Sequence, residues 1–359
     1  MAPRVLVAMS GGVDSSVAAY LLREQGYDVI GAFLRLGEGG VAAEKSRACC
    51  TVEDAIDARR VADRLGIPFY SFNYADAFKR VIDYFVDEYQ KGRTPNPCAR
   101  CNQWIKFDTF HQLARDLEAD FVATGHYVRL EREPGTDGRD VVSLHRGVDP
   151  DKDQSYFLGM VPYAVLEEGI FPVGEREKPD VRARAGVGDL PVVHKAESQE
   201  VCFVPNNDYR RVLESRSPGS MAPGRIVDED GRHLGDHDGY QGFTVGQRRG
   251  VGVAMGSPHY VVRTDPETNE VVLGPRDSVV ANELRVSEPN WLLPEAPKLP
   301  LRCEVQIRYR SKPAPCTVRD GLDGTLDVEL HEERFAIAPG QAAVFYDGDH
   351  VLGGGWIEP

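Results

Sequence analysis

Hydrophobic and polar positions alternate along the first 125 residues in a pattern that predicts strands and helices in turn. Apolar residues recur every three or four positions, the period of an amphipathic helix, in three segments, 16–26, 51–66 and 77–92. Thr51 and Asp54 have the spacing of a capping box. Short apolar runs of strand type lie between and around these helices, at 4–9, 28–36, 69–74 and 120–127. This alternation of buried-type strands with helices predicts a parallel sheet covered by helices on both faces.

The pattern changes near residue 206, where helical periodicity gives way to short β-type runs broken by Gly, Pro and Asp. A proline-rich passage, 288–300, precedes a final group of strand-like runs that includes 301–310 and is typical of a small antiparallel barrel. The expected fold is α/β, with an N-terminal doubly wound parallel sheet, a small mostly-β central domain and a C-terminal antiparallel β-barrel. The expected domain ranges are 1–205, 206–276 and 277–359.

Length and composition agree with this division. A chain of 359 residues is too long for one ordinary core, and its 42% hydrophobic and 27% charged residues are typical of a globular protein. The N-terminal apolar run is too short for a signal peptide or a membrane span, so we expect a cytoplasmic protein with no membrane association. The seven cysteines are then expected to be reduced. The net charge of −14 would repel a polyanion, so any nucleic-acid contact requires local basic patches.

The first predicted strand runs into the first predicted helix through "AMSGGVDSS", residues 8–16. Two glycines allow a tight turn that directs several N–H groups toward a ligand, and the helix N-terminus adds partial positive charge. The segment lacks the lysine of the G-x-x-x-x-G-K-[ST] loop and is not a G-x-G-x-x-G turn. Its position at the carboxyl edge of the predicted sheet indicates an anion-binding site.

Cys98 and Cys101 have Cys-x-x-Cys spacing, which serves zinc sites, redox pairs and iron–sulfur ligation alike. Spacing alone therefore leaves half a zinc site, a dithiol, or a nucleophile with a bystander all open. Cys202, between Val201 and Phe203, by itself is more typical of a buried apolar residue. The segment 302–312 carries four basic residues, one acid and an interleaved tyrosine, a composition suited to phosphate contact and base stacking.

"SGGVDSS" resembles the pyrophosphate loop (PP-loop) of the ATP pyrophosphatases, whose nucleotide-binding domain has an adenine nucleotide alpha hydrolase-like fold. Seven further segments, together with this loop, are similar to the tRNA-specific 2-thiouridylases from about residue 4 to the C-terminus: "TPNPCARCNQWIKF", "ATGHY", "KDQSYFL", "SQEVCFV", "GQRRG", "RYRSKPAPC" and "PGQAAVFYDG". The motifs are numerous, in order and spread over all three expected domains.

The resemblance implies a tRNA-uridine 2-sulfurtransferase that replaces O2 of the wobble uridine, tRNA position 34, by sulfur. ATP, with Mg²⁺, would adenylate O2, and sulfur would then displace AMP. The family pattern implies that Cys202 carries a persulfide and that Cys101 is the nucleophile, so that turnover ends in a Cys101–Cys202 disulfide. The expected partners are the tRNAs for Lys, Glu and Gln and a sulfur donor, either a cysteine desulfurase or a sulfur-relay protein.

The resemblance also implies binding residues. Those expected to bind ATP are Ala8, Met9, Ser10, Gly11, Gly12, Val13, Asp14, Ser15, Leu34 and Gly125. Those expected to contact the tRNA or its target base are Asn96, Pro97, Cys98, His126, Lys152, Asp153, Gln154, Arg308, Tyr309 and Gln341, with Arg248 and Arg249 also facing RNA.

Several alternatives stay open at this point. Cys98 stands where the family has Asp or Cys, so Cys98, Cys101 and Cys202 form a second hypothesis, an iron–sulfur cluster with one open iron site. A non-catalytic RNA-binding metal knuckle would leave "SGGVDSS" unexplained. A PP-loop ligase acting on a small molecule would not use Cys202 or the basic C-terminal segment. Thiolation at another tRNA position uses the same chemistry.

Overall fold

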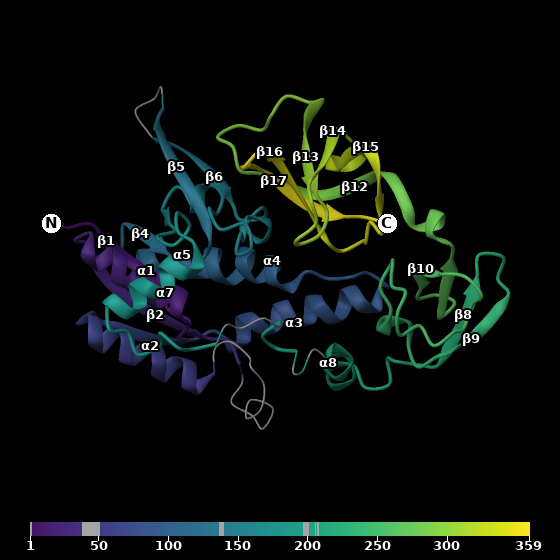
Figure 1. Cartoon of the computed structure of the whole chain (residues 1–359), viewed down its shortest axis with the longest axis horizontal. Helices are drawn as coiled ribbons and strands as arrows, with labels where there is room; N and C mark the ends of the chain where they lie inside the picture. Colours follow the sequence, from purple (N-terminus) through teal and green to yellow (C-terminus); the bar gives the residue numbers. More distant parts are fainter. Residues whose placement is uncertain (1, 38–50, 136–139, 197–200, 205, 207) are drawn as a thin grey trace.

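The computed structural model of the chain describes residues 2–37, 51–135, 140–196, 201–204, 206 and 208–359 (Figure 1). Its N-terminal sheet has five strands in the order β3-β2-β1-β4-β7, and every pair in it is parallel. This confirms the predicted doubly wound sheet. The strands are β1 (Arg4–Ala8), β2 (Asp28–Arg35), β3 (Phe69–Asn73), β4 (Phe121–Ala123) and β7 (Gly169–Ile170).

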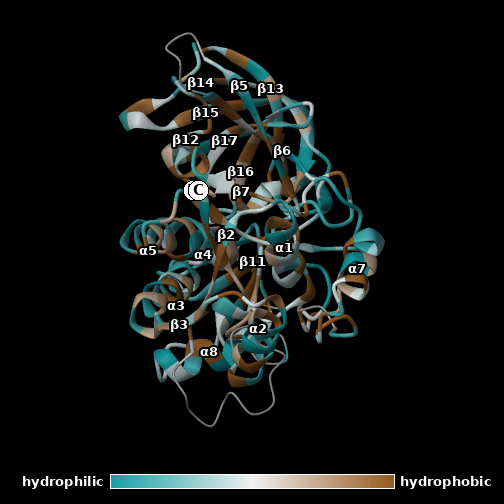
Figure 2. Ribbon diagram, turned by 90° about the vertical axis from the view of Figure 1, so that its left-hand side faces the viewer, coloured by the Kyte–Doolittle hydropathy of each residue, from teal (hydrophilic) through white to brown (hydrophobic). Residues whose placement is uncertain are grey.

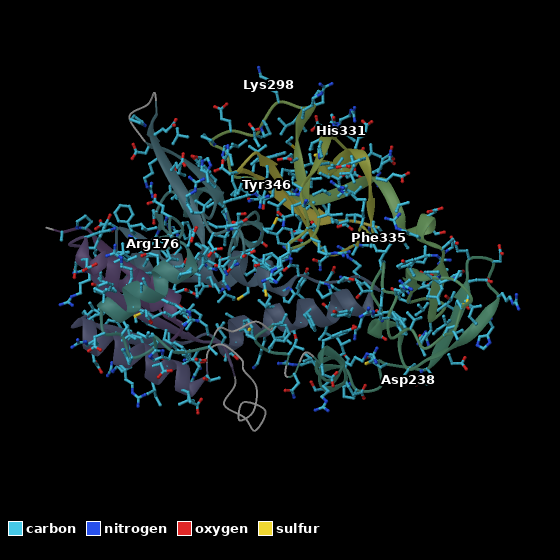
Figure 3. The ribbon with its side chains drawn as sticks, in the orientation of Figure 1. Arg176, Asp238, Lys298, His331, Phe335 and Tyr346 are labelled. Atoms are coloured by element: carbon cyan, nitrogen blue, oxygen red, sulfur yellow. The ribbon has the colours of Figure 1, made fainter. Side chains whose placement is uncertain are left out.

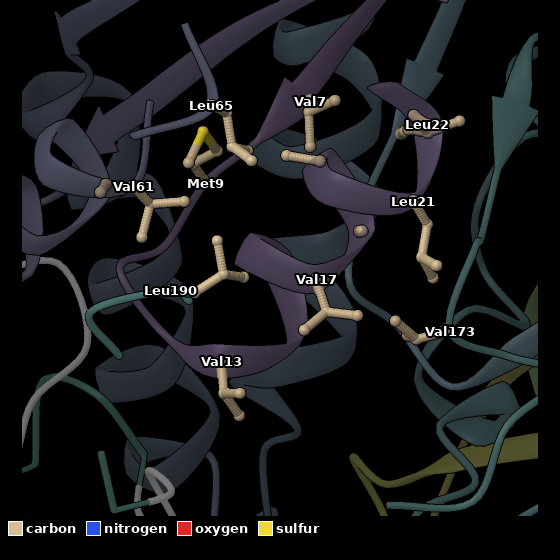
Figure 4. Packing of buried hydrophobic residues seen from close by; sticks show 14 of the residues in the cluster. Val7, Met9, Val13, Val17, Leu21, Leu22, Val61, Leu65, Val173 and Leu190 are labelled. Carbon is tan, nitrogen blue, oxygen red and sulfur yellow. The ribbon is translucent and has the colours of Figure 1, made fainter. Parts of the chain in front are cut away.

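Helices cover both faces of this sheet, as the sequence pattern predicts. Successive side chains of β1 point to opposite faces, so Val5 and Val7 enter one hydrophobic cluster and Leu6 enters the other. Figure 4 shows the first cluster, in which Val7 and Met9 pack with residues of α1 and α2. The first face carries α1 (Val13–Glu24), α2 (Val52–Leu65) and α7 (Lys178–Val187); the second carries α3 (Ala75–Gln90) and α5 (Phe110–Asp116).

Local signals define the helix ends. The Thr51 side chain accepts a hydrogen bond from the Asp54 N–H, and the Asp54 side chain accepts one from the Thr51 N–H, which confirms the capping box. Gly66 ends α2 in the left-handed conformation, with φ of 66°. The prediction of a buried strand at 69–74 is wrong in one respect, because β3 lies at the sheet edge and Tyr70 is 48% exposed.

A four-stranded sheet in the order β10-β11-β8-β9 forms the centre of the chain and confirms the predicted mostly-β central region. Its core includes Ile226, Val261 and Val271. The elements are α8 (Tyr209–Arg216), β8 (Gly224–Asp228), β9 (His233–His237), β10 (Tyr260–Asp265) and β11 (Glu270–Gly274).

The C-terminal strands form a closed antiparallel barrel, because β12 pairs with both β15 and β17. A hairpin from the N-terminal half, β5 (Val128–Pro134) and β6 (Asp140–Arg146), extends this sheet where His145 and Leu144 pair with β17. Strand pairing therefore joins the expected first and third domains. The barrel strands are β12 (Val280–Trp291), β13 (Leu301–Gln306), β14 (Ala314–Asp320), β15 (Leu326–Phe335), β16 (Ala342–Asp347) and β17 (His350–Ile357).

Short helices link the sheet to the barrel: α4 (Pro97–Cys101), a π-helix (Asn102–Thr109), a 3₁₀ turn (Ser155–Phe157) and α6 (Tyr163–Leu166). The helices carry hydrophobic and hydrophilic residues along their length (Figure 2). Across the described residues, none of the helices combines the length and the apolar character that crossing a membrane requires.

Candidate functional site

The turn between β1 and α1 has the geometry of an anion-binding loop. Gly11 has φ of +75°, and a Cβ at this position would lie 2.2 Å from the Asp54 carbonyl oxygen of α2, so only glycine fits. The Ser10 N–H donates to Ser15 Oγ at 3.1 Å, and Ser16 Oγ donates to the Gly12 carbonyl at 2.8 Å. Gly12 is the N-cap of α1 and offers no side chain for capping, so the first-turn N–H groups of this helix are oriented for a ligand.

Gly125 brings the loop after β4 onto the start of α1. A Cβ on Gly125 would lie 2.6 Å from the Ser15 amide nitrogen, so the two backbones are in direct contact. Leu34 lies one residue before the end of β2, with its side chain buried in the core. The carboxyl ends of β1, β2 and β4 meet at one edge of the sheet, so the residues expected to bind ATP lie together there.

A buried lysine that sequence reasoning missed completes this edge. Lys178 Nζ donates to both carboxylate oxygens of Asp14, at 2.6 and 2.8 Å, and the Tyr127 hydroxyl donates to Asp14 Oδ1 at 2.7 Å. Lys178 is only 7% exposed. Lys178 occupies the first turn of α7, where the helix dipole disfavours a cation. A lysine at the start of a predicted helix was the one feature of the sequence that could have indicated a special role for this residue.

The two cysteines of the Cys-x-x-Cys segment face different surroundings. The Asn96 side chain accepts a hydrogen bond from the Ala99 N–H at 3.2 Å and so caps α4, whose first residue is Pro97. Cys98 is exposed, whereas Cys101 is 7% exposed and belongs to the hydrophobic cluster under α3 and α5. The π-helix begins directly after Cys101, a geometry frequent at functional sites.

Cys202 packs against the same cluster as Cys101, although the two are far apart in the chain. Its neighbour Phe203 holds this segment through edge-to-face contacts with Phe78 and Phe85, with ring centroids 5.7 and 5.0 Å apart. The structure thus brings Cys101 and Cys202 to one cluster and leaves Cys98 at the surface.

Three of the residues expected to contact tRNA lie in the loops after β4 and β6 and bond to neighbours inside the protein. His126 is 8% exposed, its Nδ1 lies 2.7 Å from Thr124 Oγ1, and burial lowers the pKa of His126 well below its ordinary value. Gln154 Oε1 accepts from the Tyr127 N–H at 3.0 Å, and the Asp153 carboxylate accepts from Arg146 Nη1 at 2.9 Å. These contacts order the loops beside the PP-loop, and the imidazole of His126 is neutral near pH 7.

A pocket of about 590 Å³ lies between the 150–153 loop and the turn after β13. Arg308 and Tyr309 lie in that turn, so the prediction that 301–310 is one strand is wrong after Gln306. The rings of Tyr309 and Phe157 pack at a tilt of 44° with their centroids 4.4 Å apart, whereas Arg308 donates to the Ala336 carbonyl at 2.8 Å. Half of the lining residues are basic or aromatic, namely Arg146, Lys152, Tyr156, Tyr309, Arg310 and Lys312, and two are acidic, Asp151 and Asp153.

Arg146 shows how the pocket is anchored to the barrel. Its guanidinium lies 3.7 Å from the ring centroid of Tyr346, which Figure 3 labels within the barrel, and it donates to Gln306 Oε1 at 3.1 Å. Lys152 and Tyr309 line the same pocket, so two segments that the sequence predicts to contact RNA, 152–154 and 308–309, lie side by side in the fold. Arg248 and Arg249 are exposed in the central region, and Arg248 lines a separate pocket of about 370 Å³.

The residues expected to hold a metal do not form a site. Among the described residues, no group of three or more His, Cys, Asp or Glu side chains is placed to hold a metal ion. Cys98, Cys101 and Cys202 therefore do not fit an iron–sulfur cluster in this structure.

Three family models match consecutive parts of the chain. Residues 3–206 match one described as "tRNA methyl transferase HUP domain", residues 211–275 match "tRNA methyl transferase PRC-barrel domain", and residues 281–357 match "Aminomethyltransferase beta-barrel domain".

Curated relatives match the chain over its full length. A protein of Geotalea uraniireducens is 48% identical over 99% of this chain and 95% of its own length. One of Chloroflexus aggregans is 47% identical over 98% of each chain, and one of Clostridioides difficile is 43% identical over 100% of this chain and 99% of its own. All three are named tRNA-specific 2-thiouridylase MnmA.

Proposed function

Because the chain belongs to the family of tRNA-specific 2-thiouridylases, we propose that it catalyses ATP-dependent 2-thiolation of the wobble uridine of tRNA, position 34. The products are 2-thiouridine in tRNA, AMP and pyrophosphate. The observation that carries the proposal is the convergence of Cys101 and Cys202 on one cluster of the sheet that also bears the PP-loop. Two of the matching domain models are described as parts of a tRNA methyl transferase, but methyl transfer would not require this pair of cysteines. Sulfur transfer does require such a pair.

Adenylation solves the leaving-group problem. A uracil O2 oxygen is a poor leaving group. Its attack on the α-phosphate of ATP forms an O2–phosphorus bond and releases pyrophosphate, and the adenylated oxygen can then leave as part of AMP. Negative charge develops on the phosphate oxygens, and the N–H groups of the first turn of α1 are oriented to stabilise it. Lys178 pairs with Asp14 beside this turn and so neutralises a carboxylate that would otherwise repel the phosphates.

Sulfur then displaces AMP. In one route, the terminal sulfur of a Cys202 persulfide attacks C2 of the adenylated uridine and AMP leaves. The Cys101 thiolate then attacks the Cys202 sulfur, the S–S bond to the uridine sulfur breaks, and 2-thiouridine is released. In the other, the Cys101 thiolate attacks the Cys202 sulfur first and releases hydrosulfide, which then attacks C2 and displaces AMP. Both routes end in a Cys101–Cys202 disulfide, which an external dithiol must reduce before the next turnover.

Mg²⁺ is the one metal ion that the proposed reaction uses. Mg²⁺ that arrives with ATP would be held by phosphate oxygens and would neutralise their charge, since both Asp14 oxygens already accept hydrogen bonds from Lys178. An iron–sulfur cluster enters no step, because the three cysteines do not fit one here.

The proposed RNA substrates are the tRNAs for Lys, Glu and Gln, and the proposed sulfur donor is a cysteine desulfurase or a sulfur-relay protein. The residues proposed to face tRNA are those of the pocket beside Tyr309, with the exposed Cys98 near the target base.

Nucleoside analysis tests the function. We expect that tRNA incubated with the protein, ATP, cysteine and a cysteine desulfurase yields 2-thiouridine at position 34, detected by mass spectrometry of digested nucleosides. A matched tRNA with cytidine at position 34 should yield none. Thiolated uridine at another position would replace the assignment by the alternative tRNA site, and ATP cleavage without thiolated RNA would favour a small-molecule ligase.

Substitutions in the basic pocket should weaken tRNA binding. Arg310→Ala and Lys312→Ala each remove a cation from the pocket lining, so we expect weaker binding and a salt dependence of log K whose slope falls by about 1 for each phosphate that is no longer neutralised. Filter binding over a range of salt concentrations measures both quantities. Arg285→Ala is the matched control, because Arg285 is an exposed barrel arginine paired with Asp327. An unchanged slope in both pocket variants would contradict the assignment of this pocket to RNA.

A further inference from the structure

Arg100 of α4, between Cys98 and Cys101, is buried in an aromatic box. Its side chain is only 8% exposed, and its guanidinium carbon lies 4.0, 4.9 and 5.1 Å from the ring centroids of Trp356, Trp104 and Tyr84. A cation removed from water requires compensation, and stacking on aromatic faces supplies part of it. Trp356 belongs to β17, so the aromatic box joins α4, which carries Cys101, to the C-terminal barrel.

Glu288 of β12 supplies the counter-charge. Its two carboxylate oxygens accept hydrogen bonds from Arg100 Nη1 and Nη2 at 2.8 and 3.0 Å, the bidentate geometry that gives an arginine–carboxylate pair its directionality. The hydrogen bonds from Arg100 lower the pKa of Glu288, which keeps its carboxylate ionised.

The backbone at Glu288 is shaped for this contact. Glu288 has φ of +47°, a left-handed conformation that a glutamate rarely adopts, and the β12–β17 register shifts between Ser287 and Asn290. Such bulges re-aim a side chain, and here the side chain is aimed at Arg100. A strained residue that contacts the loop of a candidate nucleophile suggests a functional constraint.

The barrel also binds residues 94–95, the segment that leads into α4. Gln341 Nε2 donates to the Thr94 and Pro95 carbonyl oxygens at 3.0 and 3.1 Å, and the Thr94 N–H donates to the Pro339 carbonyl at 2.8 Å. Helix α4 is the first turn of a helical run that continues through the π-helix (Asn102–Thr109) into α5. Contacts with the barrel therefore hold the N-terminal end of this run, which carries Cys101.

We propose that Arg100 is a positioning residue for sulfur transfer, which fastens the helix bearing Cys101 to the barrel through Glu288 and Trp356. This inference rests on the proposed role of Cys101 as the nucleophile. The barrel is then part of the catalytic centre as well as an RNA-binding surface, because it sets the position of the Cys101 thiol and its protection from solvent.

Alkylation of Cys101 tests this positioning without any substrate. The full-length protein, with neither ATP nor tRNA, is treated with iodoacetamide, and the modification rate of each cysteine is followed by peptide mass spectrometry. We expect Glu288→Gln and Arg100→Leu each to raise the rate at Cys101 by about tenfold, because the loop opens more often without its fastening. The exposed Cys98 in the same peptide region is the internal reference, and its rate should stay unchanged.

Glu329→Gln is the matched control, since Glu329 is also a half-exposed barrel carboxylate bonded to an arginine, Arg319, at 2.6 Å. It should leave the Cys101 rate at the wild-type value. In the Arg100→Leu/Glu288→Gln double variant, the rate should not exceed that of Arg100→Leu alone, because both changes remove one interaction. Glu288→Gln is an isosteric change, so we expect its thermal unfolding curve to be close to that of the wild type. Such a curve would show that faster alkylation of Cys101 does not come from a general loss of structure.

Activity measurements separate positioning from RNA binding. For Glu288→Gln we expect a lower kcat for tRNA thiolation with an unchanged tRNA Kd. An unchanged alkylation rate at Cys101 in both single variants would overturn the proposal, as would a loss of tRNA affinity without faster alkylation. If the protein proves not to thiolate tRNA, the alkylation result still stands by itself, so failure of the proposed function and failure of the positioning role are distinguishable.

Discussion

Replacing either Cys101 or Cys202 by serine should abolish sulfur transfer and leave ATP binding intact. A serine oxygen cannot carry a persulfide or form the proposed disulfide, so neither route to the thiolated base remains. We expect thiolation to fall by at least about a thousandfold in each variant. Neither cysteine belongs to the glycine turn of the PP-loop or to α1, so the Kd for ATP should not change.

Two measurements check this result. Mass spectrometry of tRNA nucleosides gives the thiolation rate, and equilibrium dialysis gives the ATP affinity. Cys303→Ser is the control for a generic loss of a thiol, because Cys303 lies in the barrel, with its Sγ 3.6 Å from that of Cys316. Substantial thiolation by either Cys101→Ser or Cys202→Ser would remove that residue from the mechanism.

The exposed Cys98 separates the two cysteine hypotheses. Cys98→Asp introduces the other residue that the sequence resemblance implies for this position, and we expect it to retain thiolation activity because the proposed disulfide step does not involve Cys98. Loss of activity in Cys98→Asp, together with iron in anaerobically purified wild-type protein, would instead favour the cluster hypothesis.

Gly125→Ala should weaken ATP binding by about 100-fold, the cost expected when binding groups are misplaced by about 1 Å. The added Cβ would lie 2.6 Å from the Ser15 amide nitrogen and 2.7 Å from the Asp14 carbonyl carbon, and neither backbone atom can turn away as a flexible side chain would. The loop after β4 and the start of α1 must therefore separate, and the N–H groups of the PP-loop lose their orientation. Isothermal titration with ATP measures the effect.

Gly186→Ala is the matched control for this change. Gly186 lies in α7 with nothing within 4 Å of the position that its Cβ would take. Alanine at a helix position is favoured over glycine by about 1 kcal/mol, so this variant should bind ATP normally and unfold at a slightly higher temperature. Normal ATP affinity in Gly125→Ala would contradict the proposal that ATP binds where these two backbones meet.

Local features of the fold were predictable because their partners are close in sequence. The capping box of Thr51 and Asp54 spans three residues, and the PP-loop follows a strand and opens a helix within a single turn. The order of strands and helices, and the change to β-structure near residue 206, also follow from periodicity. The edge position of β3 did not follow, because its place at the edge depends on which strands pair with it.

The sequence by itself determined the fold class, the family resemblance and the candidate cysteines, because motifs and hydrophobic periods are local properties of the chain. Only the tertiary structure decided that Lys178 binds Asp14 across 164 residues, that Glu288 binds Arg100 across 188, and that Gln341 holds the Thr94 carbonyl across 247. The physical reason is that buried charges and loop carbonyls take partners by proximity in the folded chain, and no sequence period encodes that proximity.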